Sequence, residues 1–167
     1  SERVATEFVL KTLKKRLFSS PAAFLKTLEK HEDTIRNSRR RKTAARPTPG
    51  ILIRQIESVD DDYLIDEEAD ELTLEVLDSA SLLFTELSGE EAALLKKMKS
   101  WAERASNQLD AKAKELIRWL HKTVKPGGKW SKDRVIIFTE YRATQNWLHS
   151  ILAAEGFTED ERLMTMY

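Results

Sequence analysis

The chain has no cysteine, only five glycines and four prolines among its 167 residues, and no long apolar run. The absence of cysteine excludes disulfide scaffolds, thiolate metal sites and cysteine nucleophiles. The scarcity of glycine and proline argues against an all-β fold, which needs many turn residues. No apolar run approaches the roughly 18 residues of a membrane span, and nothing resembles a signal peptide. We therefore expect a cytoplasmic protein with no membrane partner.

The formal net charge is zero, but the charges separate along the chain into three segments. Residues 1–46 carry 13 Lys and Arg against 5 Asp and Glu, and residues 47–91 carry 1 against 14. Residues 92–167 carry 14 against 9. Such asymmetry indicates either interaction with partners or docking of one segment on another.

The basic first segment ends in a run that contains Arg39, Arg40 and Arg41. Clustered guanidinium groups can hold nucleic-acid phosphates. Alternatively, the run is the solvated C-terminus of a helix, where the helix dipole favours cations, and no aromatic residue lies between the arginines to stack on bases. A third interpretation places the acidic residues from Asp60 onward against this basic end.

Apolar residues recur at helical spacing through most of the chain. The expected helices cover residues 3–18, a segment from residue 21 into the arginine run, and residues 66–84, 90–109 and 113–124. Ser20 and Pro21 predict an N-cap and the first residue of the second helix. Ser88 and Glu91 fit a capping box at the start of the fourth.

The last forty residues show a different pattern. Residues 134–139 are apolar and β-branched, as in a strand buried on both faces. An amphipathic helix that closes at Gly156 and a second strand over residues 163–167 would complete one βαβ unit. Residues 51–59 predict a further short strand or extended segment. The fold class is therefore expected to be mainly α, with a helical assembly followed by one βαβ unit. Because two parallel strands cannot bury themselves, we expect a chain cut from something longer.

Three stretches resemble parts of Swi/Snf-related superfamily two helicases. Val135–Thr144 is similar to motif IV, at the start of their second RecA-like lobe. Asp110–Leu116 is similar to the D-x-K helix that leads into that lobe. Leu13–Phe24 resembles the segment after the first lobe in bacterial members, a group that includes the DISARM-type phage-defence helicases. The acidic middle of the chain matches no motif of the family and looks like an insertion.

This resemblance implies a division of the chain. Residues 1–46 would be a basic helical segment that follows the first motor lobe, and residues 47–109 an acidic helical insertion. Residues 110–167 would be a helix plus the opening βαβ unit of the second lobe, truncated. Intact members couple ATP hydrolysis, with magnesium, to movement along double-stranded DNA, so that the remaining helicase lobes would be partners in cis.

Three residues of the motif IV stretch would lie near the DNA backbone by resemblance: Thr139, Tyr141 and Arg142. They offer hydroxyl and guanidinium donors to phosphate oxygens, at the edge where parallel sheets bind ligands. Alternatively, Thr139 caps the following helix and Arg142 pairs with Glu140 or with solvent.

ATP hydrolysis in this family needs parts that the sequence does not contain. No G-x-x-x-x-G-K-[ST] phosphate loop occurs, and the arginine finger of the second lobe would lie beyond Tyr167. We therefore expect a fragment that is inactive alone, with no catalytic residue, cofactor or metal of its own. Two other functions stay open: a stand-alone helical protein-interaction module and a non-specific nucleic-acid-binding module.

Overall fold

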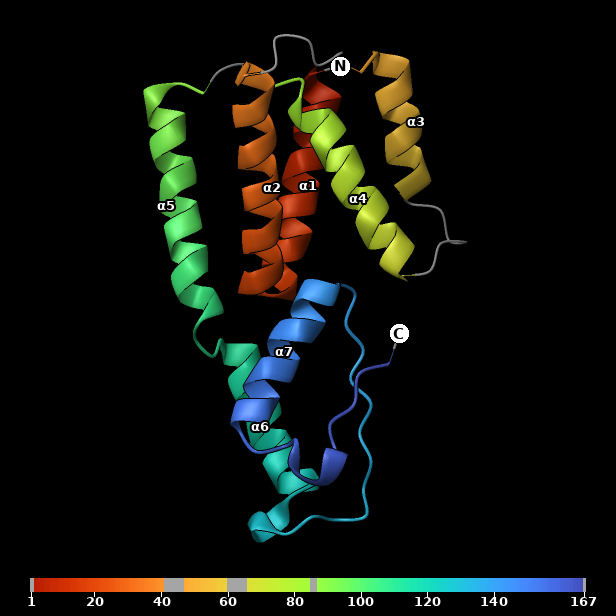
Figure 1. Cartoon of the computed structure of the whole chain (residues 1–167), viewed down its shortest axis with the longest axis vertical. Coiled ribbons are helices and arrows are strands. Elements are labelled where there is room, and N and C mark those ends of the chain that lie inside the picture. The colour runs from red at the N-terminus through yellow and green to blue at the C-terminus, as the bar shows by residue number, and fades with distance from the viewer. Residues whose placement is uncertain (1, 41–46, 60–65, 85–86, 167) are drawn as a thin grey trace.

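The computed structural model describes residues 2–40, 47–59, 66–84 and 87–166 as helices joined by irregular segments (Figure 1). The α-helices are α1 (Glu2–Ser19), α2 (Pro21–Arg40), α3 (Pro49–Val59), α4 (Asp66–Ser81), α5 (Gly89–Ser106), α6 (Ala111–Thr123) and α7 (Arg142–Ala154). Short 3-10 turns, η1 (Pro126–Gly128) and η2 (Glu159–Glu161), follow α6 and α7. The mainly helical fold class is thus confirmed. None of these helices is long and apolar enough to cross a membrane.

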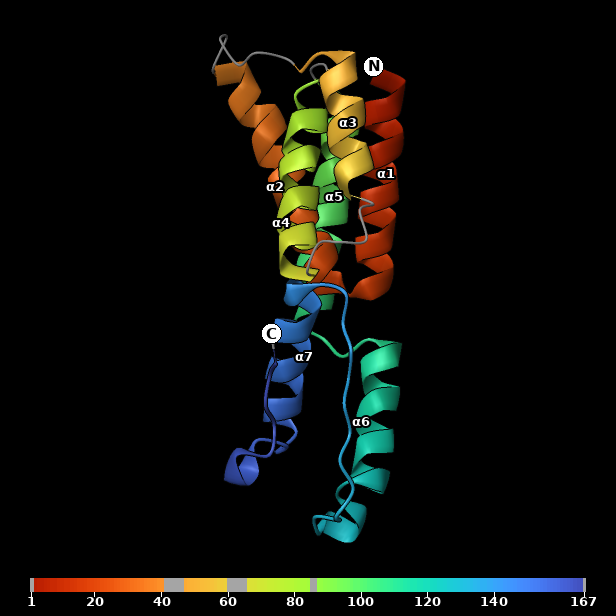
Figure 2. The same cartoon turned by 90° about the vertical axis from the view of Figure 1, so that its right-hand side faces the viewer.

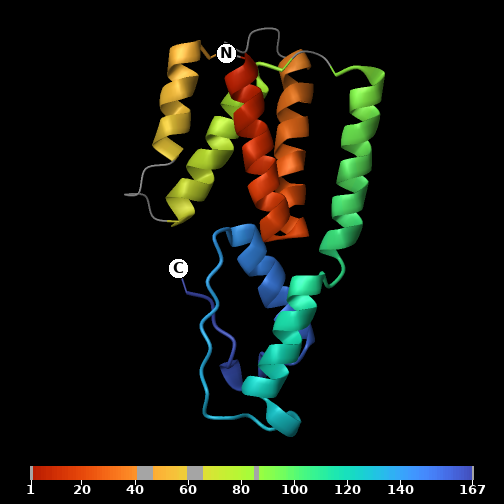
Figure 3. The ribbon, with the colours of Figure 1, turned by 180° about the vertical axis from the view of Figure 1, so that it is seen from behind.

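Helices α1 to α5 form a bundle, with α3 and α5 at its two edges (Figures 1 and 3). One apolar core joins all five helices. The buried members of this core are Ala5, Phe8, Val9, Leu13, Phe24, Leu28, Leu52, Val76, Leu77, Ala80, Leu83 and Ala102.

The helix starts follow their local sequence signals. Ser20 Oγ accepts a hydrogen bond of 3.0 Å from the amide of Ala23, and Pro21 is the first residue of α2, as predicted. Ser88 and Glu91 form the predicted capping box at the start of α5, with bonds of 3.2 and 2.7 Å. Both devices satisfy amides that the first turn of a helix leaves without partners.

The prediction of a strand or extended segment over residues 51–59 is wrong, because this segment is helix α3. Pro49 occupies the first helical turn, where its missing amide costs nothing. Leu52 is fully buried, and Ile56 and Val59 pack against the same core at spacings of four and seven residues. Helical spacing therefore serves the core better than alternation, which would have required Ile51 and Ile53 to be buried together; both are exposed.

The two strands of the predicted βαβ unit are absent: the described residues contain no strand. Residues 134–139 and 163–166 are irregular segments on either side of α7 in sequence. Phe138 is 90% exposed, and Ile136, Met164 and Met166 are exposed as well. A parallel strand with two apolar faces is stable only between neighbours that pair its amides and cover its side chains. No such neighbours are present in the part of the chain that the structure describes.

Helices α6 and α7 extend the molecule beyond one end of the bundle and have an apolar core of their own (Figure 2). This second core contains Ile117, Leu120, Val124, Leu152 and Phe157. The chain turns into it at the end of α7, where Gly156 adopts the left-handed conformation, with φ of 76°. The amide of Phe157 then donates to the carbonyl of Leu152 at 3.0 Å, as expected for a glycine-terminated helix.

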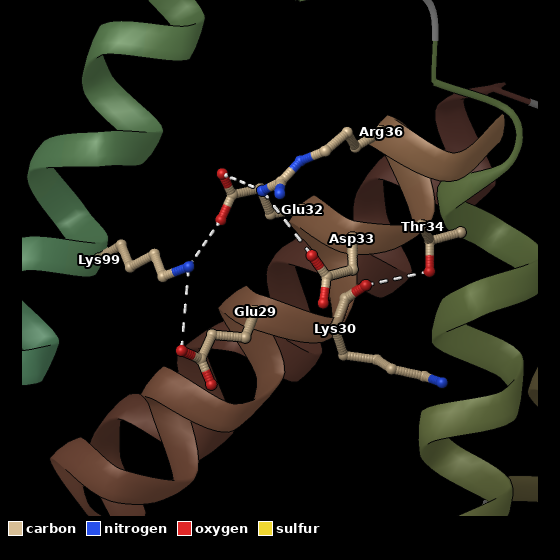
Figure 4. Close-up of polar contacts among 7 residues, drawn as sticks. All are labelled: Glu29, Lys30, Glu32, Asp33, Thr34, Arg36 and Lys99. Atoms are coloured by element: carbon tan, nitrogen blue, oxygen red, sulfur yellow. Dashed lines mark hydrogen bonds and ion pairs between the residues drawn. The ribbon is translucent and has the colours of Figure 1, made fainter. Parts of the chain in front are cut away.

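Charged side chains connect α2 to α5, as Figure 4 shows, and to α4. Lys99 of α5 lies 3.0 Å from Glu32 and 3.8 Å from Glu29, both on α2. On the opposite flank, Lys30 of α2 pairs with Asp78 of α4 at 2.6 Å. The basic first segment therefore pairs with the acidic second segment through Asp78; Asp60, which the third interpretation of the basic run invoked, lies outside the described residues.

Candidate functional site

The three stretches that carry the helicase resemblance meet where the α1–α2 corner abuts the starts of α6 and α7 (Figure 1). We call this place the junction. Its polar members are Arg16, Ser19, Ser20, Asp70, Asp110, Lys112, Glu140, Tyr141 and Thr144.

Three hydroxyl groups link the α1–α2 corner to α7. Thr144 Oγ1 lies 2.7 Å from Ser19 Oγ and 2.8 Å from Ser20 Oγ. Ser20 is fully buried and Thr144 almost so. Each hydroxyl can donate only one hydrogen, so the donor and acceptor roles of the three groups depend on one another, and together they form a small directional network. The network joins residues about 125 positions apart, and it fixes the first turn of α7 against the bundle.

The start of α6 is attached to the same corner by a lysine. Lys112 Nζ donates to the main-chain carbonyls of Phe18 and Ser19, the latter at 3.0 Å. These carbonyls belong to the last turn of α1, where they have no partner within the helix and where a cation is favoured. Asp110 serves α6 itself, since its carboxylate accepts a bond of 2.7 Å from the amide of Ala113 as an N-cap.

A buried cation forms the third link. Arg16 of α1 is 1% exposed and pairs through Nη2 with Oδ1 of Asp70 on α4, which is 7% exposed. Its guanidinium carbon lies 3.8 Å from the centre of the Tyr141 ring, in a cation–π contact. The Tyr141 hydroxyl donates to Glu140 Oε1 at 2.8 Å. Burial, together with this bond to a carboxylate, raises the pKa of Tyr141 far above its ordinary value, so the phenol stays neutral.

Two cavities flank the junction. One, of about 340 Å³, lies between α1, α3 and α4, and Glu140 and Tyr141 line one side of it. The other, of about 310 Å³, is lined by Lys112, Thr139 and Glu140, among others. Glu140 therefore lines both cavities, while Tyr141 lines the first.

The three motif IV residues singled out from the sequence occupy different environments. Thr139 is half-buried beside the second cavity and does not cap the following helix, because no side chain caps the start of α7. Tyr141 is buried beneath Arg16, and its side chain faces the bundle. Arg142 is half-buried as the first residue of α7.

The arginine run does not come near these residues. Arg39 and Arg40 are the last two residues of α2, whose first residue lies at the junction, so the helix of about 30 Å separates them from motif IV (Figure 1). Arg41 lies outside the described residues. Arg39 and Arg40 thus lie at the opposite end of the bundle from Thr139, Tyr141 and Arg142, which are close neighbours in sequence.

Sequence reasoning missed the polar residues that hold the junction together, most notably Arg16 and Asp70. Arg16 had a local signal, because it continues the buried stripe of Ala5, Val9 and Thr12 at helical spacing. A charged residue in line with a buried stripe indicates a partner elsewhere in the fold. Nothing local identifies Asp70 as that partner or Thr144 as the partner of Ser20.

The junction is suited to holding elements in place rather than to catalysis. Its carboxylates are occupied by Arg16, by the Tyr141 hydroxyl and by the amide of Ala113. Among the described residues, no three His, Cys, Asp or Glu side chains are grouped as metal ligands would be. Comparison of the chain with protein-family models, curated proteins and solved structures gave no match in any of the three.

Proposed function

We propose that the chain is the helical region between the two motor lobes of a Swi/Snf-related, ATP-dependent DNA translocase, together with the beginning of the second lobe. In this proposal the bundle α1–α5 follows the first lobe, and the segment from α6 onward opens the second. The chain transmits movement between the lobes and has no catalytic activity by itself.

The convergence of the three resembling stretches carries the proposal. They are separated in sequence by about 85 and 20 residues, and helices with similar spacing are common in unrelated proteins. A chance resemblance of three such stretches gives no reason for their polar residues to contact one another. Here Ser20 contacts Thr144, Arg16 contacts Tyr141, and Lys112 contacts the last turn of α1.

The βαβ unit belongs to the proposal as the form that the C-terminal segments adopt in the complete lobe. Residues 134–139 keep the apolar, β-branched composition of a buried strand but leave Ile136 and Phe138 exposed. Together with residues 163–166 and α7 they line a cavity of about 250 Å³. Neighbouring strands of the lobe would pair their amides and cover these side chains.

In the complete translocase, ATP and magnesium would be bound by the motor lobes, because this sequence has no phosphate loop. In this proposal Thr139 and Arg142 would contact DNA phosphates, while Tyr141 anchors the motif to the bundle through Arg16. Movement of the second lobe on DNA would then act on the bundle through Arg16, Ser20 and Thr144.

The experiment compares two valine variants of the translocase that contains this chain. Thr144→Val keeps the shape of the side chain but removes both hydroxyl contacts to the α1–α2 corner. Thr6→Val is the matched control, since Thr6 is exposed at the far end of α1 and its hydroxyl bonds only to Glu2 of its own helix. Each hydrogen bond of the network is worth about 1 kcal/mol, which corresponds to a factor of about five, so the loss of two should lower the DNA-stimulated ATPase rate by up to about thirtyfold. It should leave the rate without DNA unchanged.

Two results would contradict the proposal. The first is a parent protein without nucleotide-driven movement on DNA. The second is a Thr144→Val variant whose DNA stimulation equals that of Thr6→Val.

A second function, a stand-alone protein-interaction module, is favoured by one observation. Leu94, Met98 and Trp101 lie on one stripe of α5 at spacings of four and three residues, and all three are exposed. An exposed apolar stripe of this kind is typical of a surface that another protein covers. The two functions differ in one readily tested respect: only the first requires motor lobes in the same polypeptide.

A further inference from the structure

The end of α6 farthest from the bundle carries a cluster of exposed cations. Lys122 lies in the last turn of α6, and Lys129, Lys132 and Arg134 follow in the loop after η1. All four side chains are exposed. We call these four residues the basic tip. Figure 1 shows this loop at the opposite end of the molecule from the C-terminal end of α2.

The loop that presents the basic tip is held by its own hydrogen bonds. The amide of Ser131 donates to the carbonyl of Val124 at 2.9 Å, and the amide of Gly128 donates to Lys125 at 3.1 Å. Ser131 Oγ lies 3.1 Å from the carbonyl of Thr123 and accepts from the amide of Asp133 at 3.0 Å. Lys122 is thus on a helix and the other three cations are on a hydrogen-bonded loop, which lowers the entropic cost of binding a partner.

None of the four cations is paired with an acid among the described residues. The acids nearest in the fold are engaged elsewhere. Glu159 accepts from Lys125 at 2.9 Å and from the Trp130 indole at 3.2 Å, and these bonds hold its pKa below the usual range. Asp160 lies 3.7 Å from Arg162, and Asp133 lies 3.1 Å from the Ser131 hydroxyl. Asp133 keeps its negative charge when it accepts from a hydroxyl, so the four cations and Asp133 together carry a net charge of +3.

We propose that the basic tip binds the phosphate backbone of nucleic acid. The proposal does not rest on the proposed translocase function, because the tip contains no junction residue and lies at the far end of α6. Four exposed cations at the end of α6 and on the loop that follows it attract the phosphates of nucleic acid regardless of base sequence. A lipid surface fits less well, since membrane-binding segments combine cations with exposed apolar side chains. Between Lys122 and Arg134 no large apolar side chain is exposed, and the Trp130 and Phe157 rings pack edge-on with centres 6.1 Å apart. Trp119 and Ile136, just outside these limits, are exposed, and the vesicle arm of the test below addresses them.

The test measures binding of a short DNA duplex of arbitrary sequence to the purified chain as a function of salt. Four phosphate contacts predict a slope of log K against log salt of about −3.6 from this surface. Replacing Lys122, Lys129, Lys132 and Arg134 together by Gln should make the slope shallower by about 3.6. The affinity at low salt should fall at least about tenfold.

The control variant removes the same number and kind of charges from exposed positions on the bundle. Lys14, Lys96, Lys97 and Arg104, replaced together by Gln, also amount to three lysines and one arginine, and all four are exposed. This variant should change the slope by less than about one unit. Circular dichroism of both variants confirms that the helices are retained.

Three outcomes would overturn the proposal. Equal loss in the two variants would mean that only net charge matters. An unchanged slope in the tip variant would mean that the tip does not touch the duplex. Tighter, tip-dependent binding to vesicles of phosphatidylcholine and phosphatidylserine than to DNA would assign the surface to lipid headgroups. None of these results would alter the expected behaviour of Thr144→Val, which tests the junction separately.

Discussion

The buried ion pair between Arg16 and Asp70 is the interaction whose loss should destabilise the chain most for the smallest change in shape. Asp70→Asn preserves the size of the side chain but leaves the Arg16 guanidinium without a counter-charge in an environment that excludes water. Breaking a buried pair from one side costs about 3–5 kcal/mol, because the remaining charge has lost its hydration and gained nothing in return. We predict a loss of this size in the free energy of unfolding of Asp70→Asn.

Two substitutions of Tyr141, whose ring covers the same guanidinium, separate the contributions of its hydroxyl and its ring. Tyr141→Phe keeps the ring and removes only the bond to Glu140, so it should cost about 1 kcal/mol or less. Tyr141→Leu also removes the aromatic face 3.8 Å from Arg16, and a desolvated cation–π contact is worth about 2 kcal/mol. Because a domain of this kind is stable by only about 5–15 kcal/mol, these milder variants stay folded even if Asp70→Asn does not.

Urea unfolding followed by tryptophan fluorescence measures these differences, provided that the dependence on urea is unchanged between variants. A double-mutant cycle with Arg16→Met and Asp70→Leu completes the test. Each single change should be costly, whereas the double change replaces both charges by apolar groups and should come close to the stability of the original chain. Single costs below about 1 kcal/mol that simply add in the double variant would refute the view that this pair is buried and coupled.

Two further predictions concern the bundle. Burial lowers the pKa of His31 from its ordinary value of 6.5, and its Nδ1 lies 2.7 Å from the buried Ser81 hydroxyl. At a pH just below 6.5, this histidine is therefore protonated readily in the unfolded chain but not in the folded one. The free energy of unfolding should therefore decrease as the pH falls from 6.5 toward the lowered pKa, by up to about 1.4 kcal/mol per pH unit. This decrease should be missing in His31→Gln but present in the control variant His149→Gln. Lys99→Met should cost about 1 kcal/mol at neutral pH, because Lys99 pairs with two α2 carboxylates, whereas the exposed Lys96→Met should cost almost nothing. The hydrogen bond from Lys99 lowers the pKa of Glu32 from its ordinary value of 4.5. The stabilisation by Lys99 is therefore present above pH 4.5 and disappears as the pH falls through the lowered pKa. Urea unfolding of both lysine variants at neutral and acidic pH measures this pH dependence.

The helices could be predicted from the sequence wherever their determinants lie within a few residues. The capping box of Ser88 and Glu91 and the Ser20–Pro21 start of α2 are complete in themselves, so no knowledge of the rest of the fold is needed. Helix α3 was misjudged because Ile51 and Ile53 suggest alternation, although Leu52, Ile56 and Val59 have helical spacing. Only the core shows which of the two patterns is buried.

Residues 134–139, in contrast, could not be predicted from their local sequence alone. Their apolar, β-branched composition favours the inside of a sheet, but a strand forms only when another segment pairs with it. The same holds for the junction, where Ser20 contacts a threonine 124 positions away. Residue types and local spacing do not encode such a partner, and so the contacts of the junction could not be predicted from the sequence.

The division of the molecule into two apolar cores determines what the junction can do. The cores of α1–α5 and of α6–α7 are each closed by their own side chains, so non-directional apolar contact does not fix how one lies on the other. That task falls to hydrogen bonds and charges, which have preferred directions and lose most of their energy when misaligned. Ser20 with Thr144, Lys112 with the end of α1, and Arg16 with Tyr141 together define a single orientation of α6 and α7 on the bundle. Weakening one of them should therefore change how firmly that orientation is held before it unfolds either core. This is why the hydroxyl variant Thr144→Val is expected to act on coupling, whereas Asp70→Asn, which leaves a charge buried against the bundle core, is expected to act on stability.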